Sequence, residues 1–331
     1  LAKAHAPEVI SEGPSPTHSA VTAPPWKSTA GEWQPRSAVL DSSSETPTVR
    51  EEEVVPTSAR TFGSKDLPNI YVRKPPPPDH RESVITCGAV DSDAKGAELL
   101  AVVRQQHPTT PPPLRLSMHQ LNSRLSPGEG KLIDREHTQS QRLNTALKEE
   151  GGSVAHTNNS VDAFSRFGFH SAKYNPEAYK TYFEWIFEDM NTHLGEATGG
   201  VSGAMESMVE KLTHQSDPPL NADEKRLLNL LQRKVNPDDA KEILRTIMND
   251  KKLFTAFMKK IEGLPPGMKN GLSILHKLMT SDVKASQRVL LELAFDREVG
   301  AISEMNCKSG LDRTGHIRSL DDAISSLVEE G

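Results

Sequence analysis

Hydrophobic residues recur at helical spacing through much of the second half of the chain. Aromatic and aliphatic side chains stand at positions 179, 182, 183, 186, 187 and 190, three or four residues apart, which is the period of one helix face. Asn175 and Pro176 precede them as an N-cap and a first helical residue, and Gly195 follows. The pattern predicts a core-facing helix over residues 175–194 and a flexible Gly-rich loop over residues 195–203.

Further helices are predicted by capping signals and by the same spacing. Asn221 lies three residues before Glu224, which predicts a capping box. Asn236 and Pro237 predict another helix start, and apolar residues at 240, 243, 244 and 247 fall on one face that those at 254, 257, 258 and 261 extend. A break follows at "EGLPPG", and residues 281–295 form another amphipathic pattern.

A strand, a loop and a helix are predicted near the C-terminal end. Residues 298–306 are short, with apolar residues at 299, 302 and 305, and favour a buried strand. Apolar residues at 317, 320, 324 and 327 predict a helix after the loop. The fold class predicted is α/β and helix-rich, a sheet flanked by helices.

The first third of the chain has a different composition. Residues 1–113 hold 17 of the 24 prolines and are rich in Ser and Thr, so they bury too little apolar area to offset chain entropy. We predict a disordered leader over 1–113 and a folded domain over 114–331.

The apolar stretch "SVITCGAV" is either a strand or a partner-binding segment, with Cys87 as a small hydrophobe. Leu1 and the stop 16 residues after Gly315 indicate fragment boundaries, so the domain is expected to be truncated at its C-terminus.

Charge and cysteine content exclude several classes of protein. A net charge of −6 and a pI near 6.1 disfavour nucleic-acid binding. Two cysteines fit neither a disulfide framework nor a zinc site, and we expect no metal and no cofactor. We expect no Sec-type signal peptide, and no apolar run is long enough to span a membrane. Lysines at 251, 252, 259 and 260 form either a solvated helix face or a peripheral membrane contact.

The nine residues 307–315, CKSGLDRTG, carry the candidate chemistry. A five-residue loop between a strand and a helix N-terminus can direct backbone N–H groups at a phosphate dianion. The same positive field favours the thiolate of Cys307 as a nucleophile. Arg313 offers a planar fork for two phosphate oxygens, Gly310 lets the backbone approach the ligand, and the Thr314 hydroxyl donates to the cysteine sulfur. The predicted phosphate-binding residues are Lys308, Ser309, Gly310, Leu311, Asp312, Arg313 and Thr314.

These residues predict in-line attack by Cys307 on a phosphate monoester, which gives a phosphocysteine that water hydrolyses. The leaving alkoxide needs a proton, and the water needs a base. Asp312 lies within the loop and is the candidate general acid, although it serves equally well as a structural acceptor that holds the loop. Asp282 and Asp296 are the alternatives from upstream.

CKSGLDRTG resembles the active-site signature of the SopB/IpgD-type inositol phosphatase effectors, CKSGKDRTG, and is similar to the loop of animal inositol-polyphosphate 4-phosphatases. The resemblance implies Cys307 as nucleophile, Arg313 as phosphate clamp and Lys308 as a further contact to an anionic inositol ring. Leu311 stands where the family has lysine, as in the Sac-type lipid phosphatases, which leaves open which ring phosphate is removed.

The resemblance implies an enzyme acting on phosphoinositide lipids or inositol polyphosphates in a host cell. A Ser/Pro-rich leader also suits a bacterial substrate of type III secretion, with a secretion chaperone or host protein as partner. Two other interpretations stay open: a protein tyrosine or dual-specificity phosphatase, and a truncated, non-catalytic effector. A deep basic pocket favours the inositol substrate, whereas a slot lined by aromatic residues favours a peptide.

Overall fold

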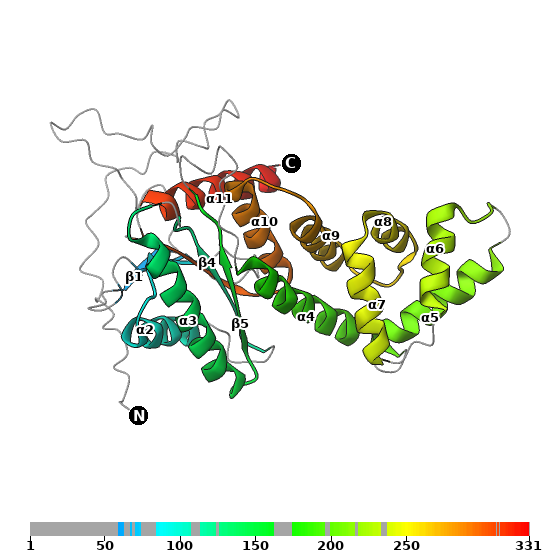
Figure 1. Ribbon diagram of the computed structural model, residues 1–331, viewed down its shortest axis with the longest axis horizontal. Helices are drawn as coiled ribbons and strands as arrows, with labels where there is room; N and C mark the ends of the chain where they lie inside the picture. The colour runs from blue at the N-terminus through cyan, green and yellow to red at the C-terminus, as the bar shows by residue number, and fades with distance from the viewer. Residues whose placement is uncertain are drawn as a thin grey trace.

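The structure is a computed structural model in which a mixed sheet and its helices occupy one end and a group of helices extends from them (Figure 1). It describes residues 59–62, 67, 70–73, 84–106, 113–123, 126–161, 174–195, 199–215, 218–232, 237–308, 310 and 312–330. Part of the predicted leader, residues 1–58, therefore lies outside the described residues.

The sheet has six strands in the described part of the chain, in the order β1-β2-β3-β6-β4-β5. The strands are β1 Ala59–Phe62, β2 Ile70–Arg73, β3 Val84–Gly88, β4 Arg115–Gln120, β5 Ser153–Asn158 and β6 Ile302–Cys307. β3, β6, β4 and β5 run parallel, while β1 and β2 pair antiparallel at one edge. β6, the last strand in the sequence, thus lies inside the sheet, as the buried strand predicted before Cys307.

The described helices surround the sheet and then leave it. They are α2 Asp93–Gln106, α3 Glu129–Lys148, α4 Asn175–Leu194, α5 Gly200–His214, α6 Ala222–Leu231, α7 Pro237–Asn249, α8 Lys251–Lys260, α9 Pro266–Thr280, α10 Ala285–Glu298 and α11 Asp312–Glu330. α2 and α3 share one hydrophobic core with the strands, and α10 and α11 pack on Met305 and Cys307 at the opposite face. The predicted helix-rich α/β class is confirmed.

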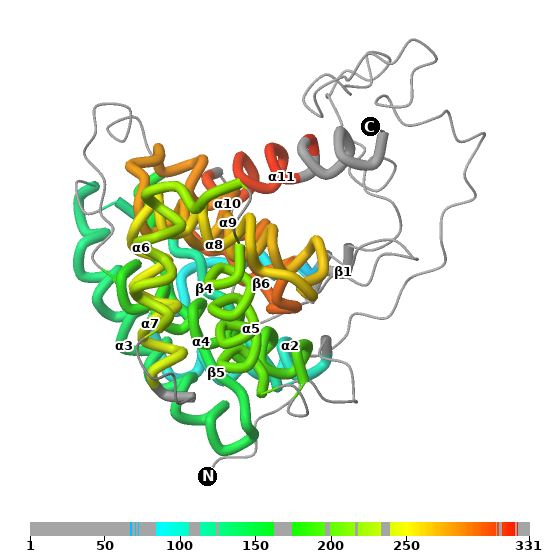
Figure 2. The backbone as a smooth tube through the Cα atoms, turned by 90° about the vertical axis from the view of Figure 1, so that its right-hand side faces the viewer, coloured from blue at the N-terminus to red at the C-terminus, as the bar shows by residue number. Residues whose placement is uncertain are grey.

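The helices α4 to α9 enclose a second core that reaches away from the sheet. Trp185, Phe257 and Leu272 are among its fully or almost fully buried members. Figure 2, seen from the helical end, shows α5, α6 and α7 in front of the strands. α4 links the two regions, because it contacts β5 at one end and α5 and α9 farther along.

The predicted helix starts are partly correct. The helix over 175–194 is confirmed, but Asn175 is its first residue and not its cap. The Asn175 side chain instead accepts from the Asn158 N–H at 2.8 Å, which ties α4 to the end of β5. The capping box of Asn221 and Glu224 is confirmed at the start of α6.

Two other helix predictions are wrong in their bounds. The face predicted to run from 240 to 261 is divided at Asp250, whose carboxylate accepts from the N–H groups of Lys252 and Leu253 and so starts α8. The predicted loop over 195–203 ends early, since α5 begins at Gly200. In the lysine cluster, Lys260 forms an ion pair with Glu224 at 3.0 Å.

The predicted boundary between residues 113 and 114 is wrong as a division of the structure. β3 and α2 both lie before it, and β3 pairs along its length with β6. The segment "SVITCGAV" is therefore a strand of the sheet, in agreement with one of its two interpretations. Val90 and Ile85 are fully buried, so this region is held by the same core as β4 and β6.

Buried charges link the helices to the sheet. Arg115 of β4 donates to both carboxylate oxygens of Asp189 in α4, at 2.7 and 2.8 Å, a bidentate pair. His119 of β4 lies 2.7 Å from Asp296 and 3.1 Å from Glu292 of α10. Burial lowers the pKa of His119, but the two carboxylates outweigh it and raise that pKa to about 10. His119 is therefore a cation that holds α10 against the sheet.

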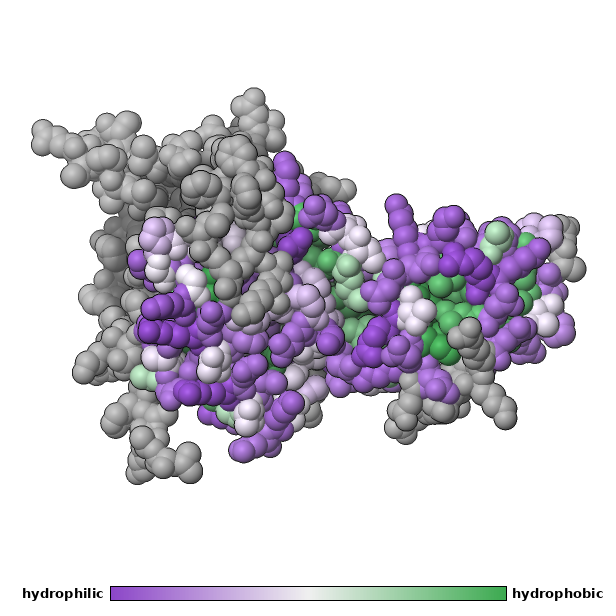
Figure 3. Space-filling view, in the orientation of Figure 1, coloured by the Kyte–Doolittle hydropathy of each residue, from purple (hydrophilic) through white to green (hydrophobic). Residues whose placement is uncertain are grey.

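The described surface is mainly hydrophilic (Figure 3). In that view, hydrophobic residues are exposed near the middle of the molecule and over the helical end. In the described part of the chain, no helix combines the length and the apolar character needed to cross a membrane.

Candidate active site

Cys307 lies at the carboxyl end of β6, between the ends of β3 and β4. It pairs in register with Gly88, and Asn306 before it pairs with Gln120. The carboxyl ends of parallel strands are where open α/β sheets bind ligands. Cys307 is only 3% exposed, and α11 begins at Asp312, five residues farther on. The predicted order of strand, loop and helix is confirmed.

Gly310 is required by its packing against β3. Its φ is +71°, and a Cβ there would lie 2.5 Å from the carbonyl carbon of Cys87 and 2.6 Å from the nitrogen of Gly88. The Gly310 N–H also donates to the Cys307 carbonyl at 3.2 Å, which closes a tight turn. The expected reason for glycine was close approach to a ligand, but the approach seen is to the neighbouring strand.

Asn122, just after β4, holds the first residue of the loop. Its side-chain oxygen accepts from the Lys308 N–H at 2.9 Å, and its amide donates to Glu136 of α3 at 3.3 Å. Glu136 also accepts from the Val90 N–H at 2.8 Å. One buried carboxylate thus ties together the segments that follow β3 and β4, and it does so directly beside the loop.

Arg313, in the first turn of α11, points back to the sheet. Its Nη1 donates to Glu129 at 2.8 Å and lies 3.4 Å from both the Leu121 carbonyl and the Asn122 side-chain oxygen. Glu129 is almost fully buried and also accepts from the Ser123 N–H at 2.8 Å. A guanidinium held in this way keeps its planar fork in one orientation.

A pair of buried acids lies behind the loop. Glu304 of β6 accepts from the Cys87 thiol at 2.9 Å and from the Asn306 amide at 3.1 Å. Burial raises the pKa of Glu304 to about 7, although those hydrogen bonds oppose the shift. Burial, together with the charge of Glu304, also raises the pKa of Glu136. The Cys87 thiol has its pKa raised well above its usual value by burial and by Glu304, so Cys87 stays a neutral thiol.

A basic cavity of about 300 Å³ opens beside Lys308. It is lined by Ala89, Asp91, Lys95, Gly128, Lys131, Leu132, Arg135 and Lys308. Four of these residues are cations and one is an acid. Asp91 pairs with Lys95 at 2.5 Å and with Arg135 at 4.0 Å. The lining residues described include no aromatic side chain, so the cavity has the character expected for a polyanionic ligand.

The other predicted site residues are placed as follows. Thr314 is buried in the first turn of α11, 1% exposed, and its hydrogen bond to the Cys307 sulfur stays a prediction. Ser309 and Leu311 lie outside the described residues, and Asp312 is described only as the start of α11. The general-acid role of Asp312 therefore also stays a prediction.

The two alternative acids lie elsewhere. Asp296 is fully buried, 2.7 Å from both His119 and Ser303, so neither solvent nor substrate reaches it in this structure. Asp282 has a largely exposed side chain and lies 4.0 Å from Arg288, at a second cavity. Among the described side chains, no group of three or more His, Cys, Asp or Glu residues is arranged to hold a metal ion.

Sequence reasoning missed Glu129, Glu136 and Asn122. Glu129 follows a Pro-Gly turn at 127–128 and starts a helix, a signal for a helix but not for an arginine partner. Asn122 follows a strand that was not predicted. Their roles depend on strand neighbours that are far apart in the sequence.

Comparisons with known proteins give a partial likeness to a solved structure. No protein family and no curated protein matches the sequence. A Legionella phosphoinositide phosphatase, SidF, has a crystal structure that aligns over 69% of this chain, with 10% sequence identity and a TM-score of 0.35. The chain spans 45% of that SidF chain. The function proposed next rests on the residues of the chain itself.

Proposed function

We propose that the chain is a cysteine-dependent phosphatase that hydrolyses phosphate monoesters of phosphoinositides or inositol polyphosphates. One observation carries the proposal: Cys307 ends an internal parallel strand, a helix starts after five residues, and the adjoining cavity holds Lys308 among four cations. A parallel-sheet edge next to a helix N-terminus is a favourable place for a phosphate dianion.

The proposed chemistry has two displacements. The Cys307 thiolate attacks phosphorus in line, an S–P bond forms, and the bond from phosphorus to the ring oxygen breaks. That oxygen takes a proton from a carboxylic acid, for which Asp312 is the candidate. A water molecule then attacks phosphorus, the S–P bond breaks, and inorganic phosphate leaves while the carboxylate takes the proton of the water.

Arg313 and the buried residues around it supply the electrostatics. The guanidinium stabilises charge that develops on the transferring phosphoryl oxygens. Glu129 orients that guanidinium, at 2.8 Å from Nη1, and is a positioning residue. Asn122 positions the loop through the Lys308 N–H. Because Nη1 of Arg313 already donates to Glu129, the proposed phosphate binds to the other N–H groups of the same guanidinium.

The basic cavity favours an inositol ring over a phosphotyrosine peptide. Lys95, Lys131, Arg135 and Lys308 come from three segments and face one space of about 300 Å³. Several phosphates on one ring satisfy several cations at once, whereas phosphotyrosine brings one phosphate and an aromatic ring that needs an apolar or aromatic slot. Which ring phosphate is removed depends on residues that include Leu311.

The setting in which the enzyme works is part of the proposal. The resemblance of CKSGLDRTG to effector phosphatases supports delivery into a host cell by a route without a signal peptide. It also supports peripheral contact with host membranes. Residues 1–113 are the proposed segment for a chaperone or host partner.

The test is phosphate release from a panel of soluble short-chain phosphoinositides, inositol polyphosphates and a phosphotyrosine peptide. We expect release from the inositol compounds and at least about tenfold lower kcat/KM for the peptide. Cys307→Ser should release no phosphate above background. Equal release by wild type and Cys307→Ser would reject the mechanism, and a preference for the peptide would favour a protein tyrosine phosphatase. Folded protein without release on any substrate would favour the non-catalytic effector.

A further inference from the structure

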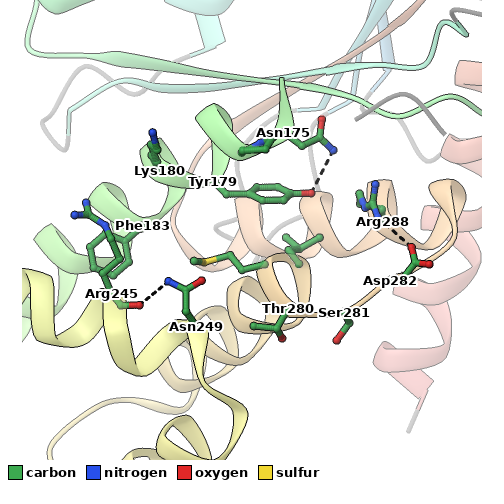
Figure 4. Close-up of a pocket in the computed structure, with 13 residues that line it drawn as sticks. Asn175, Tyr179, Lys180, Phe183, Arg245, Asn249, Thr280, Ser281, Asp282 and Arg288 are labelled. Atoms are coloured by element: carbon green, nitrogen blue, oxygen red, sulfur yellow. Dashed lines mark hydrogen bonds and ion pairs between the residues drawn. The ribbon is translucent and has the colours of Figure 1, made fainter. Parts of the chain in front are cut away.

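A second, larger cavity lies between the helices that leave the sheet. Its volume is about 770 Å³, within the range of sites for small organic ligands. It is lined by Asn175, Pro176, Tyr179, Lys180, Phe183, Arg245, Asn249, Leu278, Met279, Thr280, Ser281, Asp282 and Arg288. None of these residues lines the basic cavity beside Lys308. Figure 4 shows that the two ends of this cavity differ in chemistry.

The centre of the cavity is apolar. In Figure 4 the ring of Tyr179 lies across the middle, between the Phe183 end and the Arg288 end. Leu278 and Tyr179 are buried residues, and Leu278 and Met279 end α9 on the opposite side. These side chains present methylene, thioether and ring surface, which favours an alkyl chain or an aromatic ring in contact with them.

The Tyr179 wall is fixed by hydrogen bonds beneath it. The Tyr179 hydroxyl donates to Glu292 at 2.9 Å and accepts from the Asn175 amide at 3.3 Å. Burial, with the adjacent Glu292 carboxylate, raises the pKa of Tyr179, so the ring stays neutral. Because Asn175 is itself tied to Asn158, the wall is already formed without a ligand.

One end of the cavity is formed by a buried cation, Arg288. Arg288 is only 9% exposed, and its Nε has no hydrogen-bond partner among the described residues. Its Nη2 donates to the Val283 carbonyl at 3.2 Å. Asp282 is 4.0 Å away with a side chain that is 90% exposed, and the buried Glu292, which accepts from Tyr179, lies one turn farther along α10. A buried guanidinium with an unsatisfied donor is unfavourable unless a ligand accepts from it.

The opposite end carries two cations, Arg245 and the exposed Lys180. Arg245 pairs with Glu184 at 3.3 Å and with Glu242 at 3.0 Å, and its guanidinium stacks over Phe183 at 4.9 Å. An anion therefore gains less at Arg245 than at Arg288. The cavity consequently has a buried cation at one end, an apolar centre and a more exposed far end, where Arg245 is paired with acids and Lys180 is exposed.

We propose that this cavity binds an amphipathic anion, with one carboxylate or phosphate group at Arg288 and an apolar chain or ring against Tyr179, Leu278 and Met279. The carboxylate or phosphate accepts from the guanidinium of Arg288 where it lines the cavity, and the body of the ligand covers the apolar centre. The inference goes beyond the proposed phosphatase activity and does not depend on it, because the two cavities have no described lining residue in common.

The experiment is isothermal titration calorimetry of the full chain with four probes. Octanoate has both the carboxylate and the apolar chain, acetate has the carboxylate alone, and octanol has the apolar chain alone. Octyl phosphate tests the phosphate form and is titrated into both wild type and Arg288→Met, so that only the binding lost in Arg288→Met is assigned to this cavity and not to the Cys307 loop. We expect octanoate and octyl phosphate to bind one to one, and acetate and octanol to bind at least about tenfold more weakly.

Three variants locate the binding. Arg288→Met keeps the stem but removes the charge, and should weaken octanoate binding about tenfold or more. Met279→Trp fills the apolar centre and should abolish binding. Arg104→Met, at an exposed site on α2, is the matched control and should bind like wild type. Circular dichroism checks folding, and if Arg288→Met does not fold, Met279→Trp decides.

The outcomes that overturn the proposal are equally specific. Wild type that binds none of the probes, or that binds octanol as tightly as octanoate, overturns it. So does octanoate binding that survives Met279→Trp in a folded protein. Equal loss in Arg104→Met would show that the charge of the chain, and not the Arg288 end of this cavity, attracts the anion.

Discussion

The two cavities of this molecule use their cations differently. The cavity beside Lys308 lies at the carboxyl edge of the sheet and takes its cations from segments that follow β3, from α3 and from the loop after β6. The cavity at Arg288 lies between α4, α7, α9 and α10 and sets one unsatisfied cation beside apolar surface. The number of cations and the surface between them therefore favour a polyphosphate in one cavity and an amphipathic monoanion in the other.

The difference also shows where each cation is anchored. At the sheet edge, Arg313 is oriented by Glu129 and the loop by Asn122, both through bonds to residues that follow β4. At the helical cavity, Arg288 relies on a backbone carbonyl alone for its hydrogen bond. Precise orientation suits a group that must match a transition state, whereas a loosely held cation is enough for binding.

The largest effect expected is from Arg313→Lys. Lysine keeps the charge but loses the planar fork, so kcat/KM should fall by about a thousandfold on every phosphate monoester. Steady-state kinetics on an inositol polyphosphate and on a small aryl phosphate would measure it. Arg226→Lys, on α6 at the helical end, is the control and should keep wild-type kinetics. A loss of less than about threefold in Arg313→Lys would contradict the role of the fork.

Gly310→Ala should destabilise the sheet edge. The added Cβ meets the backbone of Cys87 and Gly88 and a φ of +71°, which together cost roughly 2–4 kcal/mol of unfolding free energy. Chemical denaturation monitored by circular dichroism measures the change. Gly315→Ala is the matched control: its Cβ would meet nothing within 4 Å, so stability should stay the same or rise. Equal stability of the two variants would show that the approach to β3 is not required.

Lys131→Met tests the basic cavity separately from the loop. Loss of one charged contact should lower kcat/KM for inositol polyphosphates about ten- to a hundredfold and leave a small aryl phosphate nearly unaffected. The control is Lys252→Met, an exposed lysine on α8. If both substrates lose activity equally, Lys131 supports the fold or the loop and not ring recognition.

The last effect concerns the pH dependence that Glu304 gives to stability. Its pKa is raised to about 7 in the folded chain from an ordinary 4.5, so its protonated form stabilises the fold fully below about pH 4.5 and this contribution is lost as pH rises through 7. Relative to Glu304→Gln, wild type should therefore lose about 2–3 kcal/mol of unfolding free energy between pH 5 and pH 8. Denaturation of both proteins at the two pH values measures it. A difference independent of pH would mean that Glu304 is ionised throughout.

The sequence predicted α4, α6, the face that spans α7 and α8, α10 and the strand–loop–helix around Cys307, because each of these has a local signal, whereas α2, α3, α5 and α9 were not predicted. α4 and α6 have periodic apolar faces and recognisable starts, and β6 and α11 flank the motif. The phosphate-binding roles of the loop residues stay predictions that rest on the chemistry of those residues and not on the sheet.

The rest could not be predicted because buried strands here carry polar residues. β4 has Arg115 and His119, and β5 has His156, each paired or packed against partners far away in the sequence. These polar residues at buried positions remove the alternation of apolar and polar residues by which a strand is predicted. β3 was not assigned to the folded domain because the sequence around it is rich in proline. Asn122, Glu129 and Glu136 have their roles only because β4 lies beside β6 in the sheet.

The central claim is that Cys307 is the nucleophile, and trapping of the phosphoenzyme tests it most directly. Wild type is mixed with an inositol polyphosphate, quenched with acid during turnover, digested and examined by mass spectrometry. The account predicts a phosphate on the peptide that contains Cys307, no label in Cys307→Ser, and a retained label in Cys87→Ser, the matched change at the other cysteine. Steady phosphate release without a label on Cys307, or with a label on another residue, would contradict it.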